Sequence, residues 1–286
     1  MRKSLIFFLL SGVLVLLWSG CAGQPETVKK EQAPVVEEKA EEAEPAEPEM
    51  KKIVEEVQLV SKRSSYYPDG VLASYRVYTY AEEGTEIREE IMYNSDDEVE
   101  ERITYSYEDG KLIERRNYNG EGELQRTHIY AYNQKGLLAE DKLLNPKGEI
   151  QTRQVYEYNQ NGKKSKWSVY NGDGALLSYS MYEYRDGLNT RIENYNAAGD
   201  LLDYFIIEYN EDGNPTKRTW YNSDEQIEES RTYEYEDGAL VKETLYRANG
   251  SVKRYVVYTN NSYGNPVEVI YMDAGEDIQD QVTYEY

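Results

Sequence analysis

Few side chains in this sequence have the type and spacing that catalysis needs. His128 is the only histidine, and no nucleophile motif accompanies it, so the sequence favours a strand residue over a general base. Adjacent carboxylates such as Glu100 and Glu101, or Asp96 and Asp97, could bind Ca²⁺ or serve a glycosidase. Because acidic residues are frequent at the predicted turns, we interpret these pairs as solvated turn residues. We therefore predict a protein that is not an enzyme, with no metal site and no cofactor.

Aromatic side chains are better candidates for binding. The chain has 30 Tyr against 3 Trp and 3 Phe, and Tyr and Trp on an open sheet could stack on sugar rings or pack against a protein. The candidate binding surface is one face of the predicted sheet, formed by Trp167, Trp220, Tyr179, Tyr204 and Tyr255. The alternative is that these rings only fill the apolar row of a repeat.

The N-terminal residues have the pattern of a secretory signal. Arg2 and Lys3 precede an apolar run over residues 5–18, which is too short for a comfortable membrane span. The only cysteine, Cys21, follows this run. A single cysteine excludes a disulfide within the chain and a Cys/His zinc site.

The residues around this cysteine resemble the lipobox of bacterial lipoproteins, in which signal peptidase II cuts before a cysteine that is then lipid-modified. Residues 19–21 match, whereas Trp18 stands where Leu is usual. The resemblance implies a signal peptide over residues 1–20 and a lipid on Cys21 that tethers the chain to a membrane. Ala22, in place of the Asp that favours inner-membrane retention, implies the outer membrane, on its periplasmic side or at the cell surface. The alternative is an ordinary secretory peptide with an unrelated cysteine.

Residues 21–56 form an acidic segment rich in Glu, Ala and Pro. It lacks aromatic residues after the cysteine, so it cannot bury enough apolar surface to fold, and we predict a disordered linker. The net charge of the whole chain is −22, which excludes nucleic acid as a partner, since phosphate binding needs a basic surface.

Residues 57–286 form a repeat array. A turn residue, usually Gly, recurs mostly every 12 to 14 residues, at Gly70, Gly84, Asp97, Gly110, Gly122, Gly136, Gly148, Gly162, Gly174, Gly187, Gly199, Gly213, Glu225, Gly238, Gly250, Gly264 and Gly275. Every second position is 25 or 26 residues apart from about residue 84 onward, so the repeat is a two-strand unit. Asp-Gly turns predict type I′ hairpins, and Asn-Xaa-Xaa-Gly turns predict type I turns with a glycine bulge.

These turns predict that a tyrosine faces an aliphatic residue across each hairpin. The predicted pairs are Tyr93–Val99, Tyr107–Leu112, Tyr118–Leu124, Tyr132–Leu138, Tyr170–Leu176, Tyr195–Leu201, Tyr221–Ile227, Tyr235–Leu240 and Tyr246–Val252. Even spacing between successive pairs places all of them on one face, because side chains alternate along a strand.

We predict an all-β fold, an elongated antiparallel up-and-down meander of about 17 strands. Neither face is cleanly apolar, which favours a mostly single-layer twisted sheet over a sandwich; the alternative is a closed or spiral barrel. An open sheet has two edges. Lys62 and Arg63 protect the first, and the last, ending at Tyr286, predicts edge-strand self-association.

The turn units resemble known repeat families. Residues 132–136, 158–162 and 209–213 read YNQKG, YNQNG and YNEDG. They resemble the YD repeats of the Rhs family, whose pattern is Tyr-Asp-Xaa-Xaa-Gly-Arg, with Asn for Asp and no Arg. They are also similar to MORN-type hairpin repeats, and a sheet on a lipid anchor is similar to the single-layer outer-surface lipoproteins of spirochaetes. These resemblances imply an architecture and no active site.

The sequence thus predicts a lipid-anchored cell-envelope protein that offers a non-catalytic interaction surface to protein or glycan. Two alternatives stay open: a glycan-active enzyme that uses Asp or Glu, and a purely structural envelope spacer.

Overall fold

A computed structural model describes residues 58–82 and 84–286. The described residues all belong to one compact unit. The predicted signal peptide, the lipidated Cys21 and the acidic linker lie outside the described residues. Within the described ranges, no helix is long and apolar enough to cross a membrane.

The described chain consists of eighteen antiparallel strands joined by short turns. The strands are β1 (Lys62–Tyr66), β2 (Leu72–Tyr80), β3 (Ile87–Asn94), β4 (Val99–Glu108), β5 (Lys111–Asn119), β6 (Leu124–Tyr132), β7 (Leu138–Leu144), β8 (Ile150–Tyr158), β9 (Lys164–Asn171), β10 (Leu176–Arg185), β11 (Leu188–Asn196), β12 (Leu201–Tyr209), β13 (Pro215–Asn222), β14 (Ile227–Glu236), β15 (Ala239–Arg247), β16 (Val252–Asn260), β17 (Pro266–Asp273) and β18 (Ile278–Glu285). The prediction of about 17 strands is one short, because seventeen predicted turns separate eighteen strands.

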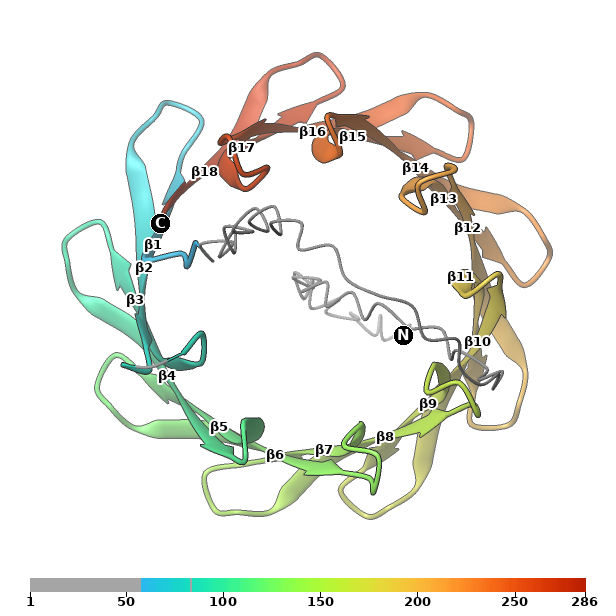
Figure 1. The fold of residues 1–286 in the computed structure, drawn as a ribbon, viewed down its shortest axis with the longest axis horizontal. Helices are drawn as coiled ribbons and strands as arrows, with labels where there is room; N and C mark the ends of the chain where they lie inside the picture. Colours follow the sequence, from blue (N-terminus) through green and yellow to red (C-terminus); the bar gives the residue numbers. More distant parts are fainter. Residues whose placement is uncertain (1–57, 83) are drawn as a thin grey trace, which may run out of the picture. The chain divides into compact units, whose positions relative to one another are not determined.

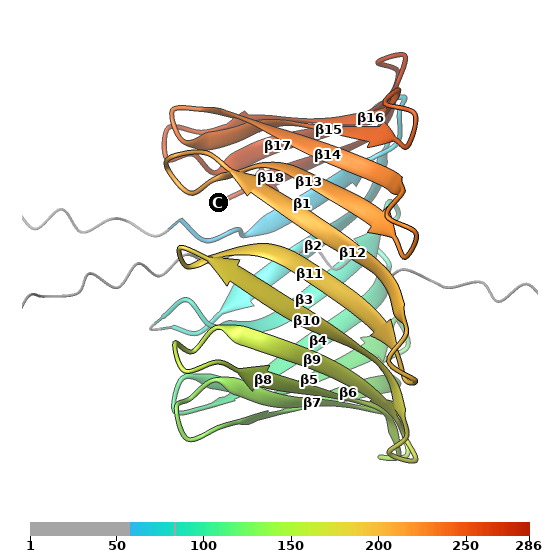
Figure 2. The same ribbon diagram turned by 90° about the vertical axis from the view of Figure 1, so that its right-hand side faces the viewer.

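The sheet closes into a barrel. Each strand pairs with its neighbours in sequence, and β1 also pairs with β18, from Lys62 opposite Glu285 to Tyr66 opposite Gln281. Figure 1 shows the strands as a ring in sequence order, and Figure 2 shows them inclined across the barrel wall. The expected single-layer open sheet is therefore wrong, and the closed alternative is confirmed. The two free edges that motivated edge-strand self-association pair with each other.

The turns have the predicted chemistry. At Asp109 and Gly110 the φ angles are 49° and 70°, as a type I′ turn requires. In the longer turns, such as Asn119 to Gly122, the glycine amide donates to the asparagine carbonyl at 3.0 Å. Glu225 takes a positive φ of 61° where most repeats have glycine.

Asp97 likewise takes a positive φ, of 63°. In the last turn the prediction is displaced by one residue. Glu276, and not Gly275, has the positive φ, of 68°.

A β-bulge follows each of these turns. On β5, Leu112 faces Tyr107 but Glu114 faces Ser106, so Ile113 has no opposite residue. Every pairing of consecutive strands contains such a shift, and the closing β1–β18 pairing contains none. Bulges increase the twist and bend of a sheet, and this regular bending explains closure.

The bulges also overturn the predicted faces. Because each bulge inserts one residue, residues an even number apart across it lie on opposite faces. The tyrosine–aliphatic pairs are all present. However, Tyr107–Leu112 lies on one face of the sheet and Tyr118–Leu124 on the other, so the prediction of a common face is wrong.

Side chains line the inside of the barrel, and few of them are packed into a buried core. Eighteen strands about 4.8 Å apart and tilted by about 40° give a backbone ring about 35 Å across. Side chains that extend inward from opposite walls cannot fill a ring of this width. Among the described residues, the buried apolar side chains are Ile103, Tyr204, Leu245, Val256, Val269 and Val282. Only Val256, Val269 and Val282 form a buried cluster.

Candidate functional site

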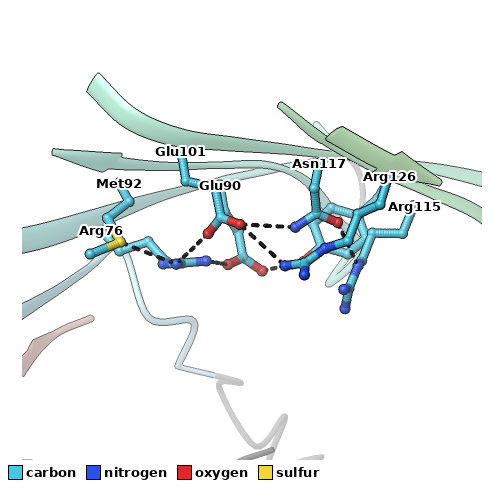
Figure 3. A network of polar contacts seen from close by, with 8 residues as sticks. Arg76, Glu90, Met92, Glu101, Arg115, Asn117 and Arg126 are labelled. Atoms are coloured by element: carbon cyan, nitrogen blue, oxygen red, sulfur yellow. Dashed lines mark hydrogen bonds and ion pairs between the residues drawn. The ribbon is translucent and has the colours of Figure 1, made fainter. Parts of the chain in front are cut away.

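Contacts between side chains on successive strands show which face of the barrel wall lines the lumen. Arg76 on β2 binds Glu90 on β3 at 2.7 Å and reaches Glu101 on β4 at 2.9 Å. A side chain can span two strands in this way where curvature brings side chains together, on the concave side. Figure 3 shows this network on a single side of the sheet, with Asn117 and Arg126 continuing it. We call the face that carries Arg76 the lumen wall, and the other face the exterior.

Register carries this assignment around the barrel, because directly paired residues share a face. The rim at which β1 begins and β18 ends is called here the terminal rim, and the opposite one the far rim (Figure 2). Asp109–Gly110 turns at the terminal rim, and Asn119–Gly122 at the far rim.

A row of tyrosines lines the lumen wall next to the terminal rim. The hydroxyl of each donates to the carbonyl oxygen of the residue twenty positions earlier. These bonds, of 2.7 to 3.0 Å, run from Tyr80 to Val60, Tyr132 to Leu112, Tyr158 to Leu138, Tyr184 to Lys164, Tyr209 to Asn189, Tyr235 to Pro215 and Tyr286 to Pro266. Each bond except the first and the last joins two consecutive strands near the terminal rim, so these tyrosines hold the wall together.

A second row of tyrosines lies one step deeper in the lumen wall. It contains Tyr78, Tyr105, Tyr130, Tyr156, Tyr182, Tyr233 and Tyr258. Burial raises the pKa of Tyr78 and of Tyr130 to about 12. Burial also raises the pKa of Tyr258, which donates to Glu243 at 2.6 Å. This row is therefore uncharged at neutral pH and offers rings with hydrogen-bonding edges.

The lumen wall also contains the only histidine. His128 Nδ1 lies 2.9 Å from Asp141, which also accepts from Gln154 at 3.4 Å. Gln154 accepts in turn from Trp167 Nε1 at 3.1 Å. Within residues 58–82 and 84–286, no hydroxyl or thiol side chain hydrogen-bonds to His128, and no three His, Cys, Asp or Glu residues are grouped to hold a metal ion. The geometry supports a structural hydrogen-bond chain.

The predicted binding residues do not form one surface. Trp167 and Trp220 lie on the lumen wall, as expected for a shared face, but Tyr179, Tyr204 and Tyr255 lie on the exterior. There Tyr179 and Tyr204 stack on Tyr195 and Tyr221 with ring centroids 4.9 and 4.8 Å apart, and Lys242 lies 4.7 Å from the ring of Tyr255. Neighbouring side chains therefore already cover at least one face of each of these exterior rings.

The exterior is charged along the middle of its strands. It carries Arg102, Arg116, Lys142, Arg153, Lys166, Arg191, Lys217 and Lys242. A basic residue facing lipid near the middle of a bilayer costs about 2–4 kcal/mol. The exterior is therefore suited to water and poorly suited to acyl chains.

Sequence reasoning missed the polar network of Figure 3 and the lumen-facing Arg218. One sequence signal could have revealed the bulges, which decide which residues face the lumen. Adjacent apolar residues after a turn, as at Leu176–Leu177 and Leu201–Leu202, break strand alternation, and the second residue of each pair is the bulged one, about half exposed.

This chain matches a family model and is similar to solved structures at low sequence identity. A family model described as "Uncharacterised protein" matches residues 61–179. No curated protein matches the chain. Among solved structures, the chain is similar to a porin-like protein from Bacteroides uniformis, with 11% identity and a TM-score of 0.42, over 79% of this chain and 97% of that one.

Two further solved structures are similar. One is a porin-like protein from Bacteroides vulgatus, with 9% identity and a TM-score of 0.33, over 80% of this chain and 99% of that one. The other is a TcdB2–TccC3–TEV structure, with 12% identity and a TM-score of 0.27, over 74% of this chain. This chain spans 15% of the length of the latter.

Proposed function

We propose that this chain is a lipid-anchored, non-catalytic protein of the cell envelope whose lumen wall binds glycan. The observation that carries the proposal is the two rows of lumen-facing tyrosines, with Trp167 opposite Tyr156 of the deeper row and Trp220 one step deeper, opposite Phe205. Aromatic faces with polar edges suit sugar rings. A lumen of this width admits an extended polymer more easily than a folded domain, which favours glycan over protein.

The anchor belongs to the same proposal. Cys21 would carry the lipid, and the charged exterior supports a barrel that is tethered to a membrane without entering it. Metabolic labelling with a palmitate analogue tests this, because the wild-type chain should be labelled and a Cys21→Ala chain should not. The likeness to YD and MORN-type repeats is proposed for the hairpin units alone.

A glycan array probed with the full Cys21→Ala chain tests binding. We expect retention of glycans without their cleavage. Trp167→Ala should weaken retention, whereas Tyr255→Ala on the exterior should leave it unchanged. Release of shortened glycans would favour an enzyme instead, and no retention on any glycan would favour a structural spacer.

A further inference from the structure

Among the described residues, four buried polar side-chain atoms have no hydrogen-bond partner, and one of them, Arg126 Nε, lies in the network of Figure 3. The other three lie on another part of the lumen wall. They are Asn189 Oδ1 on β11, and Arg218 Nε and Trp220 Nε1 on β13. A buried polar group left unpaired costs about 1–3 kcal/mol. Such groups are rare in native proteins, and each one calls for an explanation such as strain, a functional role or a bound ion.

Arg218 also lacks a counter-charge. It lies between Ile207 on β12 and Arg231 on β14, and its guanidinium carbon lies 3.9 Å from the ring centroid of Phe205. Arg231 binds Glu243 at 2.7 Å. Among the described residues, no carboxylate lies within ion-pair distance of Arg218. Burial lowers the pKa of Arg218, and Arg231 lowers it further.

The arginine Arg76 on the opposite wall does have counter-charges. There Arg76 binds Glu90 and Glu101, so its charge is cancelled by the barrel itself (Figure 3). The half-buried Arg218 has no such carboxylate among the described residues, so an external anion would meet no competing partner there. The net charge of −22 does not forbid this, because distant charges are screened over about 8 Å at physiological salt.

The unpaired atoms define what would satisfy them. Arg218 and Trp220 are donors and require an acceptor, best an anion at the guanidinium. Asn189 Oδ1 is an acceptor and requires a donor. Trp220 stacks on Phe205 with ring centroids 6.0 Å apart, which adds an apolar face. A ligand with a carboxylate, a hydroxyl and an apolar ring face matches all of these groups.

We propose that Asn189, Arg218 and Trp220 form a subsite for the carboxylate-bearing sugar of an acidic glycan. Arg218 receives the carboxylate, Trp220 donates to the same sugar, and Asn189 accepts from a hydroxyl. This inference rests on the proposed glycan-binding function and adds the substrate class.

Calorimetric titration of the full Cys21→Ala chain tests the subsite, with galacturonic acid oligosaccharides and neutral galactose oligosaccharides of equal length as probes. We expect the wild type to prefer the acidic probe. Arg218→Gln should lower affinity for the acidic probe at least tenfold and leave the neutral probe unaffected. Arg254→Gln is the matched control, because Arg254 also faces the lumen but on β16, and it should change affinity less than twofold.

Stability separates a binding role from a structural one. Removing a half-buried charge that has no counter-charge should raise the melting temperature of Arg218→Met without ligand, whereas loss of a structural residue would lower it. Equal affinity of the wild type for both probes, or unchanged acidic binding in Arg218→Gln, would overturn the subsite and leave glycan binding standing. Absence of binding to either probe, together with a silent glycan array, would overturn both.

Discussion

At the scale of single residues, tyrosine occupies two chemically different positions in this barrel. Tyr158 on the lumen wall donates its hydroxyl to the Leu138 carbonyl at 2.7 Å. Tyr246 on the exterior packs opposite Val252, and its hydroxyl makes no side-chain hydrogen bond within the described residues. The tyrosines of the row next to the terminal rim therefore have a structural role in addition to the binding role proposed for the lumen wall.

This difference predicts unequal effects of removing the hydroxyl. Tyr158→Phe should lower the free energy of unfolding by about 1 kcal/mol, because it leaves a carbonyl without its partner. Tyr246→Phe is the control and should change it by less than about 0.5 kcal/mol. Urea unfolding followed by circular dichroism measures both. Equal losses would contradict the assigned hydrogen bonds.

The turn residues make a second prediction at this scale. Glu225 has a positive φ of 61°, which is unfavourable for a residue with a side chain. Gly250 has a φ of 78° in the next turn along the same rim. Glu225→Gly should raise stability by about 0.5–1 kcal/mol, after allowance for the entropy of glycine in the unfolded chain. Gly250→Glu, where no atom crowds the added carbon, should lower it. A shift in thermal midpoint of the opposite sign in either variant would refute this account of the turns.

At the scale of elements, the pairing of strands was predictable and their faces were not. Turn length fixes which residues oppose each other next to the turn, so Tyr107–Leu112 and Tyr118–Leu124 followed from the sequence. The bulge at Ile113 lies one residue beyond the pair that the turn fixes. Counting residues between turns does not reveal this bulge, although the adjacent apolar residues Leu112 and Ile113 signal it. The candidate surface is divided between two faces for this reason.

The deeper row of lumen tyrosines predicts alkaline instability. Their pKa values are raised above the usual 10, to about 12 for Tyr78 and Tyr130, so between these values the unfolded chain loses protons that the folded chain retains. Stability is therefore complete below about pH 10 and falls as the pH rises toward 12. Urea midpoints from pH 8 to 11.5 should show this decline. A constant midpoint above pH 10 would contradict burial of the row.

At the scale of the whole molecule, closure depends on a contact between the two ends of the array. Nothing in the local repeats distinguishes an open meander from a ring, because each hairpin contacts only its neighbours in both. The sequence therefore predicted the repeat and its antiparallel order, but the pairing of β1 with β18 required the cumulative curvature of seventeen bulged hairpins. Closure also creates the lumen wall, on which the proposed binding depends.

A designed disulfide between β1 and β18 tests closure most directly. Ser64 lies opposite Thr283, and facing residues of antiparallel strands have Cα atoms about 4.5–5.5 Å apart, within the range of a disulfide. In a Cys21→Ser chain, Ser64→Cys with Thr283→Cys should form an intramolecular bond in the folded monomer, detected by mass spectrometry and by altered mobility without reductant. Ser64→Cys with Thr127→Cys, on the distant β6, should not. Failure of the first pair to bridge within one chain, or bridging only between chains, would contradict the closed barrel.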